Sequence, residues 1–431
     1  MVQIPSLQFA ATNQSPNRYD VTVTVPEVLV RVFYKEAINA QQYEASTYGF
    51  SKGLTPVSYI EHNFKPNLIT HVQEFLFHYF VLSFLYQNIY IHKLVLAADP
   101  NLATIEVTPT GNVLFHFILE TVTLELYEWE DLIFKAPPRK NYKDIDRQVA
   151  SFIKQEEQLA QEYEPVIAIG DWICFDVALV SADRNPLFGE YAERLWLKIG
   201  DEEVDKEFQE IFMGKRIHEP FYTKAHSLQE YFSDYIDTHY LFLITVQHIV
   251  PYRFFSLDYL KHHFMLKKPK DVSRKLIEVF SYRNDMSQRR ETIEAVSKLL
   301  LTYHQFEIPD YLLEHHQQRV LEAVHNNPDY LVYKAQNDFK KTVRRLAEKQ
   351  AREAVLMDHI AYSRGLDADI NDVCAYLAFT HRPRMKEFIY FDHPTTKKLG
   401  QEMPISHFMV RHSCLREKTL NHVIHTLAAR R

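Results

Sequence analysis

The sequence predicts an α+β protein of several domains, in which two units that mix helices and strands precede an all-helical C-terminal part. Its 431 residues exceed the roughly 100–200 residues of one domain, so we expect two to four domains. Only 9 residues are glycine, about 2% against a typical ~7%, which leaves few tight turns and favours long helices. No glycine lies between Gly214 and Gly365, and from Pro251 onward the apolar residues have helical spacing.

We expect the first domain over residues 17–134, after a loose polar tail of about 16 residues. Alternation predicts a strand at Tyr19–Val25, and prolines, which suit first helical turns, mark the helix starts. The further elements expected are the helices Pro26–Tyr43, one from Pro56, and Pro66–Tyr90, then the strands Ala103–Pro109 and Val113–Tyr127. The apolar run Phe75–Tyr86 is shorter than the ~20 residues of a membrane span, so we interpret it as a core helix.

A small sheet domain is expected over residues 145–250, after the basic, proline-rich linker Lys135–Tyr142. Amphipathic spacing and alternation predict the helices Asp144–Tyr163 and Val204–Met213 and strands at GDWICFDVALV (170–180), Ala192–Ile199 and Tyr240–Ile249.

The third domain, residues 251–431, is expected to be helical throughout. The candidate helices are Ser256–Met265, Lys270–Tyr303, Pro309–Val324, Asp329–Arg364 and Pro404–Ala429. Two of them exceed 30 residues without a heptad pattern, which is typical of extended arms.

Charge and composition exclude several classes of function. The net charge of −7 makes the chain a poor electrostatic match for DNA or an anionic membrane, and we expect neither as a partner. No glycine pair has the spacing of a dinucleotide fingerprint or a P-loop, so no nucleotide cofactor is expected. Three distant cysteines, and an N-terminus without the basic and apolar regions of a signal peptide, indicate a cytoplasmic protein.

No metal or nucleophilic site is expected. Adjacent helical histidines such as His262 and His263 point about 100° apart and cannot easily share a metal ion. Acidic clusters such as Asp201–Glu203 are typical of a solvated turn, and no serine has the flanking glycines of a nucleophile elbow. The aromatic content of 13% indicates either core filling or, on helical arms, a surface for apolar partners.

The loop YGFSKGLTP (48–56) resembles the ribosome-docking loop PGFRxGKxP of the trigger factor family, a family of bacterial ribosome-associated chaperones. Gly49, Phe50 and Gly53 stand in register, and Lys52 fills a variable position where many members carry lysine. Ser51 replaces the family's arginine, and Leu54 replaces its second basic residue. The resemblance implies ribosome binding by Gly49, Phe50, Ser51, Lys52 and Gly53.

The order of elements over residues 19–425 resembles the same family. FQEIFMGKRIHEPF (208–221) is similar to a segment of its FKBP-like domain, and RFFSLDYLKHHF (253–264) begins a stretch similar to its helical arms. The resemblance implies a trigger-factor-like ribosome-binding domain, an FKBP-like prolyl isomerase domain and helical chaperone arms. It also implies docking near the ribosomal exit tunnel and ATP-independent holding of nascent or unfolded polypeptides, and it leaves open a homodimer.

The FKBP-like pattern also implies where an isomerase cleft would lie and which of its residues depart from the pattern. The candidates for the cleft are Phe175, Val177, Phe188, Val204, Phe208 and Phe242. Val177 replaces the tyrosine of the FKBP pattern, and Asp205 falls where an apolar residue is expected. Because a buried carboxylate opposes binding of an apolar proline ring, we expect little or no isomerase activity.

Two functions therefore remain open. The first is a ribosome-associated folding chaperone with an isomerase-like domain. The alternative is a free-standing protein-binding or assembly factor on the same scaffold, without ribosome docking or isomerase activity. Co-sedimentation with ribosomes separates the two.

Overall fold

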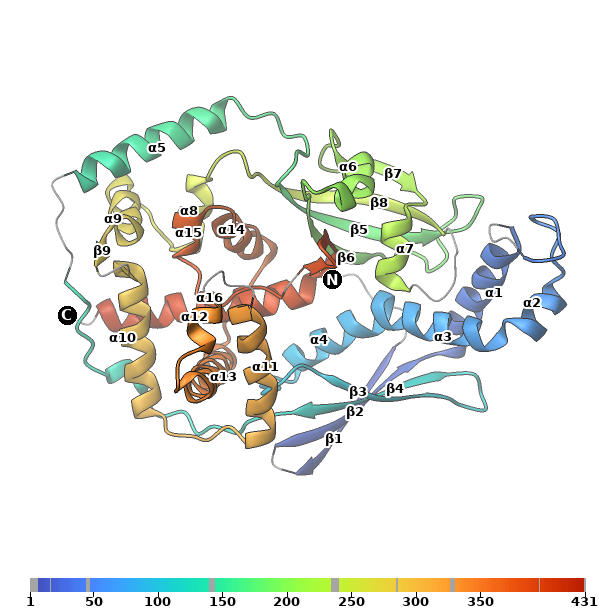
Figure 1. The fold of residues 1–431 in the computed structure, drawn as a ribbon, viewed down its shortest axis with the longest axis horizontal. Helices are drawn as coiled ribbons and strands as arrows, with labels where there is room; N and C mark the ends of the chain where they lie inside the picture. The colour runs from blue at the N-terminus through green and yellow to red at the C-terminus, as the bar shows by residue number, and fades with distance from the viewer. Residues whose placement is uncertain are drawn as a thin grey trace.

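The computed structural model describes residues 7–15, 17–43, 47–138, 144–233, 240–283, 286–325, 330–394 and 396–429. Its architecture is mixed α and β: an N-terminal sheet and a middle sheet lie at one side, and most helices of the C-terminal part gather at the other (Figure 1).

The N-terminal sheet has four antiparallel strands in the order β1 (Gln8–Ser15), β2 (Arg18–Val25), β4 (Val113–Glu120) and β3 (Asn101–Val107). On the central strands, alternate residues such as Val23 and its partner Phe115 are buried, so one face of this sheet packs on the core. The three predicted strands are confirmed, although β4 ends at Glu120 instead of Tyr127.

The expectation of a loose N-terminal tail is wrong, because Gln8–Ser15 forms the edge strand β1. Its residues are mostly exposed and show no apolar alternation, so no sequence pattern indicates a strand there. Backbone pairing with β2, from Gln8 opposite Thr24 to Asn13 opposite Tyr19, holds it in place.

Helices α1 (Glu27–Tyr43) and α2 (Val57–Asn63) project at one end of the molecule (Figure 1). After them, α3 (Lys65–Leu76), the π-helical turn η1 (Phe77–Val81) and α4 (Leu82–Ile91) form one continuous helix. Among the described helices, this one, Lys65–Ile91, could cross a membrane by length and composition, yet 56% of its most apolar stretch is buried inside the protein. The prediction of a core helix is confirmed.

The middle sheet has the order β13-β6-β5-β8-β7. The predicted strands are confirmed as β5 (Trp172–Val180), β6 (Glu193–Lys198) and β8 (Leu241–Val250). Helix α5 (Ile145–Gln161) precedes them, and the predicted helix Val204–Met213 is the turn η3 (Glu203–Asp205) followed by α6 (Lys206–Phe212). The sequence analysis missed β7 (Pro220–Thr223) and α7 (His226–Phe232), which are short and without clear periodicity.

The C-terminal part is helical, but the expectation of helices longer than 30 residues is wrong. Helix Lys270–Tyr303 is divided into α9 (Pro269–Phe280) and α10 (Gln288–Tyr303) by the short strands β9 (Tyr282–Arg283) and β10 (Met286–Ser287). The hydroxyl of Ser287 accepts a hydrogen bond from Arg290 N and so caps a new helix within the expected one.

The second long helix is divided into α12 (Tyr330–Lys334) and α13 (Phe339–Arg364), which ends at Gly365 with a φ of 61°. Helices α8 (Leu257–His263), α11 (Asp310–His325) and α16 (His407–Ala429) were expected, whereas α14 (Ile370–Thr380) and α15 (Pro383–Lys386) were not. The remaining strands are β11 (Lys397–Lys398), β12 (Gln401–Glu402) and β13 (Ile405–Ser406).

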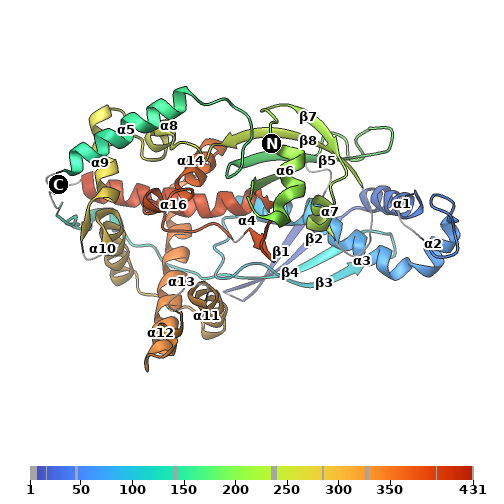
Figure 2. The same ribbon diagram turned by 45° about the horizontal axis from the view of Figure 1, so that its top comes forward.

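Helix α16 connects the C-terminal helices to the middle sheet. It directly follows β13, whose Ile405 pairs with Trp196 of β6, and it then runs through the helical part toward its far end (Figures 1 and 2). The indole nitrogen of Trp196 donates a hydrogen bond of 3.1 Å to Nδ1 of His407. The C-terminal part therefore contributes a strand to the sheet of the middle part.

The buried cores also run across the expected domain boundaries. One cluster combines residues of the N-terminal sheet, such as Phe115, with residues of the middle sheet, such as Phe175. A second combines Trp172 of the middle sheet with C-terminal residues such as Phe379. The division at 134–145 and 250–251 stays a prediction.

Candidate functional site

The segment 47–56, which precedes α2, forms a protruding turn. Gly49 and Gly53 have φ values of 85° and 83°, which a residue with a Cβ adopts only at a cost. The amide of Gly53 donates to the carbonyl of Gln42 over 3.2 Å, and the side-chain amide of Gln42 donates to the carbonyl of Thr55 over 2.8 Å. These bonds tie the loop to the end of α1, so its tip has a defined shape.

The tip of this loop is largely apolar. Tyr48 and Leu54 are 99% and 72% exposed, and the ring of Phe50 lies edge-on against Tyr59 at 4.8 Å. The five residues predicted to bind the ribosome lie together here: Gly49, Phe50, Ser51 and Lys52 are exposed, and Gly53 is half-buried. Phe50 keeps 36% of its surface accessible, so it is available to a partner. The tip therefore presents apolar side chains and one ammonium group.

The six predicted cleft residues do not line an open cleft. Phe175, Val177, Phe188, Phe208 and Phe242 are all buried in one core, each at most 6% exposed. The sixth, Val204, is 51% exposed and lies apart from that core. The four phenylalanines among these residues lie in the same core, where other side chains of the protein cover them.

The long helix fills the face where the cleft was expected. The hydroxyl of Tyr79, in the π-helical turn, donates to the carbonyl of Val177 at 3.2 Å and accepts from the amide of Leu179 at 3.0 Å. The pairing of β5 with β6 ends at Val177, so Tyr79 satisfies two backbone groups of β5 beyond the end of its partner strand. The ring of the adjacent Phe80 lies 4.9 Å from that of Phe188.

A buried carboxyl group, Glu193, fastens the same interface. Its oxygens accept from the hydroxyl of Ser83 and lie 2.7 Å from the hydroxyl of Tyr191, which also donates to the carbonyl of Tyr79 over 2.8 Å. Burial raises the pKa of Glu193 to about 8, against the lowering effect of the bonds from Ser83 and Tyr191. In its protonated form Glu193 can donate to Tyr191, which leaves the Tyr191 proton for the Tyr79 carbonyl.

Asp205, which was expected in the cleft, and the nearby Glu207 both have structural partners. Asp205 Oδ1 accepts from the amide of Glu402 over 2.8 Å, and Glu207 accepts from the amides of His226 and Ser227 at the start of α7. Both carboxylates therefore accept hydrogen bonds from backbone amides. The sequence alone cannot place these amides.

A large open cavity lies between α4, α11, α13 and α16. Its volume is about 1030 Å³. In Figure 2, α13 crosses α16 and α11 lies beside α13, and residues of all four helices line the cavity. Its apolar lining includes Tyr86, Leu96, Leu321, Ala354, Val355 and Met409, and its polar lining includes Asp99, His316, His325, Lys397, His412 and Arg416.

One wall of this cavity is fixed by a buried ion pair. The Arg416 guanidinium donates two hydrogen bonds to Asp358, at 2.9 and 2.7 Å, and His412 Nε2 lies 3.2 Å from the same carboxylate. Burial alone would raise the pKa of Asp358, but Arg416 and His412 hold it well below its usual range. Across the cavity, His316 Nε2 donates a hydrogen bond of 2.8 Å to the carbonyl of Ala97. This bond connects α11 to the segment that follows α4.

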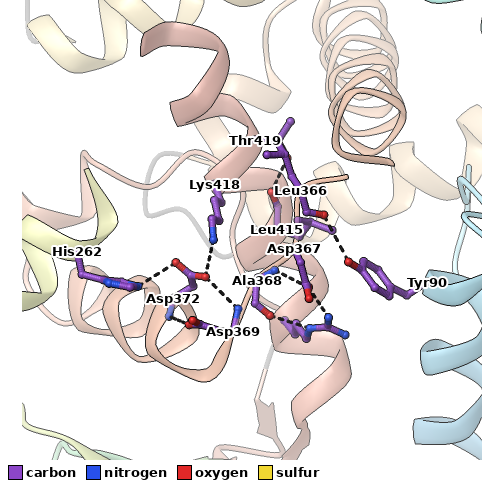
Figure 3. A network of polar contacts seen from close by, with 11 residues as sticks. Tyr90, His262, Leu366, Asp367, Ala368, Asp369, Asp372, Leu415, Lys418 and Thr419 are labelled. Atoms are coloured by element: carbon purple, nitrogen blue, oxygen red, sulfur yellow. Dashed lines mark hydrogen bonds and ion pairs between the residues drawn. The ribbon is translucent and has the colours of Figure 1, made fainter. Parts of the chain in front are cut away.

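Among the described residues, one group could offer metal ligands: His262, Asp369 and Asp372, with ligand atoms within 4.8 Å of one another. Figure 3 shows that Lys418 donates to Asp372, at 2.7 Å, and that Asp369 and Asp372 cap α14 reciprocally, at 2.8 and 2.9 Å. An ammonium group thus takes the place that a cation would need, and the cluster is explained as a helix cap.

Comparisons with known proteins add little. No protein-family model matches the chain. A solved structure of the trigger factor chaperone, described for promiscuous substrate recognition in folding and assembly, is similar over 97% of this chain and 100% of that chain, at 12% identity and a TM-score of 0.36. A similarity this distant carries no argument about function.

The sequence analysis missed the residues that close the cleft. Tyr79, Ser83 and Glu193 carry no motif, and the contacts that bring them together span 100 or more positions of the chain. One signal was present: polar residues such as Ser83 within an apolar core helix indicate a polar partner in the interior.

Proposed function

We propose that this protein is a chaperone that holds unfolded polypeptide segments without nucleotide hydrolysis. The observation that carries the proposal is the cavity between α4, α11, α13 and α16. At about 1030 Å³ it lies at the upper end of the range of small-molecule pockets, ~300–1,000 Å³, and it is partly open to solvent.

The lining of the cavity suits a varied client. Apolar side chains such as Leu96 and Val355 alternate with histidines and charged groups such as Arg416, so both apolar side chains and backbone groups of an extended segment find partners. Binding many sequences calls for such a broad, mixed surface instead of one shaped pocket.

Prolyl isomerase activity is not part of the proposal. Tyr79 and Phe80 occupy the face of the sheet where a substrate proline would have to lie, in contact with Val177 and Phe188. In a protease-coupled assay on a proline tetrapeptide, we expect turnover more than tenfold below that of an ordinary FKBP-type domain. Turnover within that factor would contradict this part of the proposal.

An aggregation assay without ATP tests the holding activity. We expect the full-length protein, at a few-fold excess, to suppress aggregation of a chemically denatured client. Ala354→Trp places a large ring in the cavity wall and should remove most of that effect. Gln155→Trp adds the same ring on the exposed face of α5 and is the matched control. Equal suppression by both variants would contradict the cavity as the client site.

A second candidate function, docking on the ribosome, rests on the exposed loop tip around Phe50 and Lys52. Residues 1–120 carry six Lys or Arg and nine Asp or Glu, a net charge of −3, so electrostatic attraction to ribosomal RNA is weak. Co-sedimentation with ribosomes, with and without the double change Phe50→Ala/Lys52→Ala, tests it. No co-sedimentation of the unmodified protein would favour a free-standing binding or assembly factor.

A further inference from the structure

A second, smaller pocket of about 430 Å³ lies where the long helix, the end of α7 and residues 396–409 meet. Glu74, His78 and Leu82 face it from three successive turns of the long helix, because positions four apart share one face. Phe232, Met403 and Met409 supply apolar walls. The pocket therefore combines apolar walls with polar and charged side chains, so it can hold a ligand that has both an apolar and a polar part.

One carboxylate oxygen of Glu74, which lines this pocket, is buried without a hydrogen-bond partner among the described residues. This oxygen is Oε2. Glu74 is also the one acidic residue of the 27-residue helix Lys65–Ile91, which is otherwise strongly apolar. A buried acceptor without a donor is costly, so a donor from outside the chain would be favoured there.

The other charged groups around the pocket are neutralised or solvated. Glu230 pairs with His226 over 3.2 Å when that histidine is protonated, and Lys397 lies 4.0 Å from Glu402. Lys398 is exposed to water, where its charge is screened. Burial, with a smaller contribution from Lys398, lowers the pKa of His78 to about 4, so His78 is neutral at pH 7. Among the described residues that line the pocket, Oε2 of Glu74 is the buried polar atom without a partner, so a hydrogen-bond donor is the group that complements it.

We infer that this pocket binds a protonated amine carried on an apolar body, with the ammonium group on Glu74 and the apolar part against Phe232, Met403 and Met409. A polypeptide amino terminus with an apolar first residue and a free alkylamine share this chemistry. The site stands independently of the proposed chaperone activity, because its ligand need not be an unfolded chain.

Calorimetric titration of the full-length protein tests the inference with three probes: n-hexylamine, the tripeptide Leu-Ala-Gly, and its N-acetylated form. We expect hexylamine or the free tripeptide to bind, and acetylation to weaken binding at least about tenfold, because it removes the charge-assisted hydrogen bond. Binding of hexylamine alone assigns the site to small amines, and binding of both assigns it to chain termini as well.

The variant Glu74→Gln should weaken amine binding at least about tenfold, whereas Glu157→Gln, on the exposed face of α5, should not change it. Thermal unfolding of both variants checks that the fold is kept. Binding of none of the probes, equal binding of the acetylated tripeptide, or unchanged binding by Glu74→Gln would overturn the inference and leave water as the partner of Glu74.

Discussion

The loop tip at residues 48–56 and the inner face of the middle sheet were both predicted as binding sites from sequence patterns. They differ in accessibility, because the tip is exposed and the sheet face is buried. At the tip, side chains expected to reach a partner, such as Phe50 and Lys52, are exposed. On the sheet, the side chains expected to reach a substrate are covered by Tyr79 and Phe80.

The difference shows what a local motif can establish. The tip is built from neighbours in sequence, so its two glycines and short loop are enough to define it. The sheet face is covered by a helix about 100 residues away along the chain, and no pattern in the strands themselves reports that helix. A local motif predicts the presence of side chains, whereas their accessibility depends on the rest of the fold.

The largest effect is expected for Tyr79→Ala. It removes a fully buried ring and leaves the Val177 carbonyl and the Leu179 amide without their partner, so we expect a loss of about 4 kcal/mol or more in the free energy of unfolding. Urea unfolding measures this loss. Tyr79→Phe, which keeps the ring, should cost only about 1–3 kcal/mol. A loss below 1 kcal/mol for Tyr79→Ala would show that the helix does not fasten the sheet.

The next effect is a pH dependence from Glu193. Its pKa is about 8 in the folded protein against an ordinary 4.5, so between these values the folded state holds a proton that the unfolded state has lost. The stability contributed by this group therefore falls as the pH rises from 4.5 to 8. Glu193→Gln keeps the hydrogen bonds without the charge and should stabilise the protein by a few kcal/mol more at pH 8.5 than at pH 5.

Urea unfolding of this variant and the unmodified protein at both pH values measures the difference, and the exposed Glu203→Gln is the control for loss of one charge. A gain from Glu193→Gln that does not depend on pH would contradict a protonated Glu193.

Removal of an aromatic ring should cost less stability at the loop tip than at the middle sheet. Phe50→Ala removes a ring that is already 36% exposed and contacts mainly Tyr59, so we expect less than about 1 kcal/mol of lost stability. Its effect should instead be on partner binding, measured by co-sedimentation. A stability loss near that of Tyr79→Ala would show that the tip is part of the core.

The smallest expected effect is that of Ser51→Arg, which restores the basic residue of the resembling loop. One added cation on a domain of net charge −3 should tighten ribosome binding only a few-fold, and less at high salt. Binding assays at two salt concentrations measure it. If affinity is unchanged at low salt, the loop is not a docking element.

The sequence predicted most strands and helices because their apolar periodicity is strong, as in Tyr19–Val25 and in the core helix Pro66–Tyr90. It failed at β1, where backbone pairing acts without apolar alternation, and at Ser287, where a cap divides a periodic helix. Of the candidate sites, the tip could be located, whereas the cavity could not, since its walls come from four helices far apart in the chain.

The most direct test of the proposed chaperone activity is crosslinking from the cavity to an unfolded client. The native Cys174, Cys374 and Cys414 are buried, so a single added cysteine, Ala354→Cys, can be labelled selectively with a photoactivated crosslinker. We expect crosslinks to a denatured client without ATP, and far fewer to the same client once folded or from Gln155→Cys on α5. Equal crosslinking from the two positions, or none from Ala354→Cys, would contradict the cavity as the place where polypeptides are held.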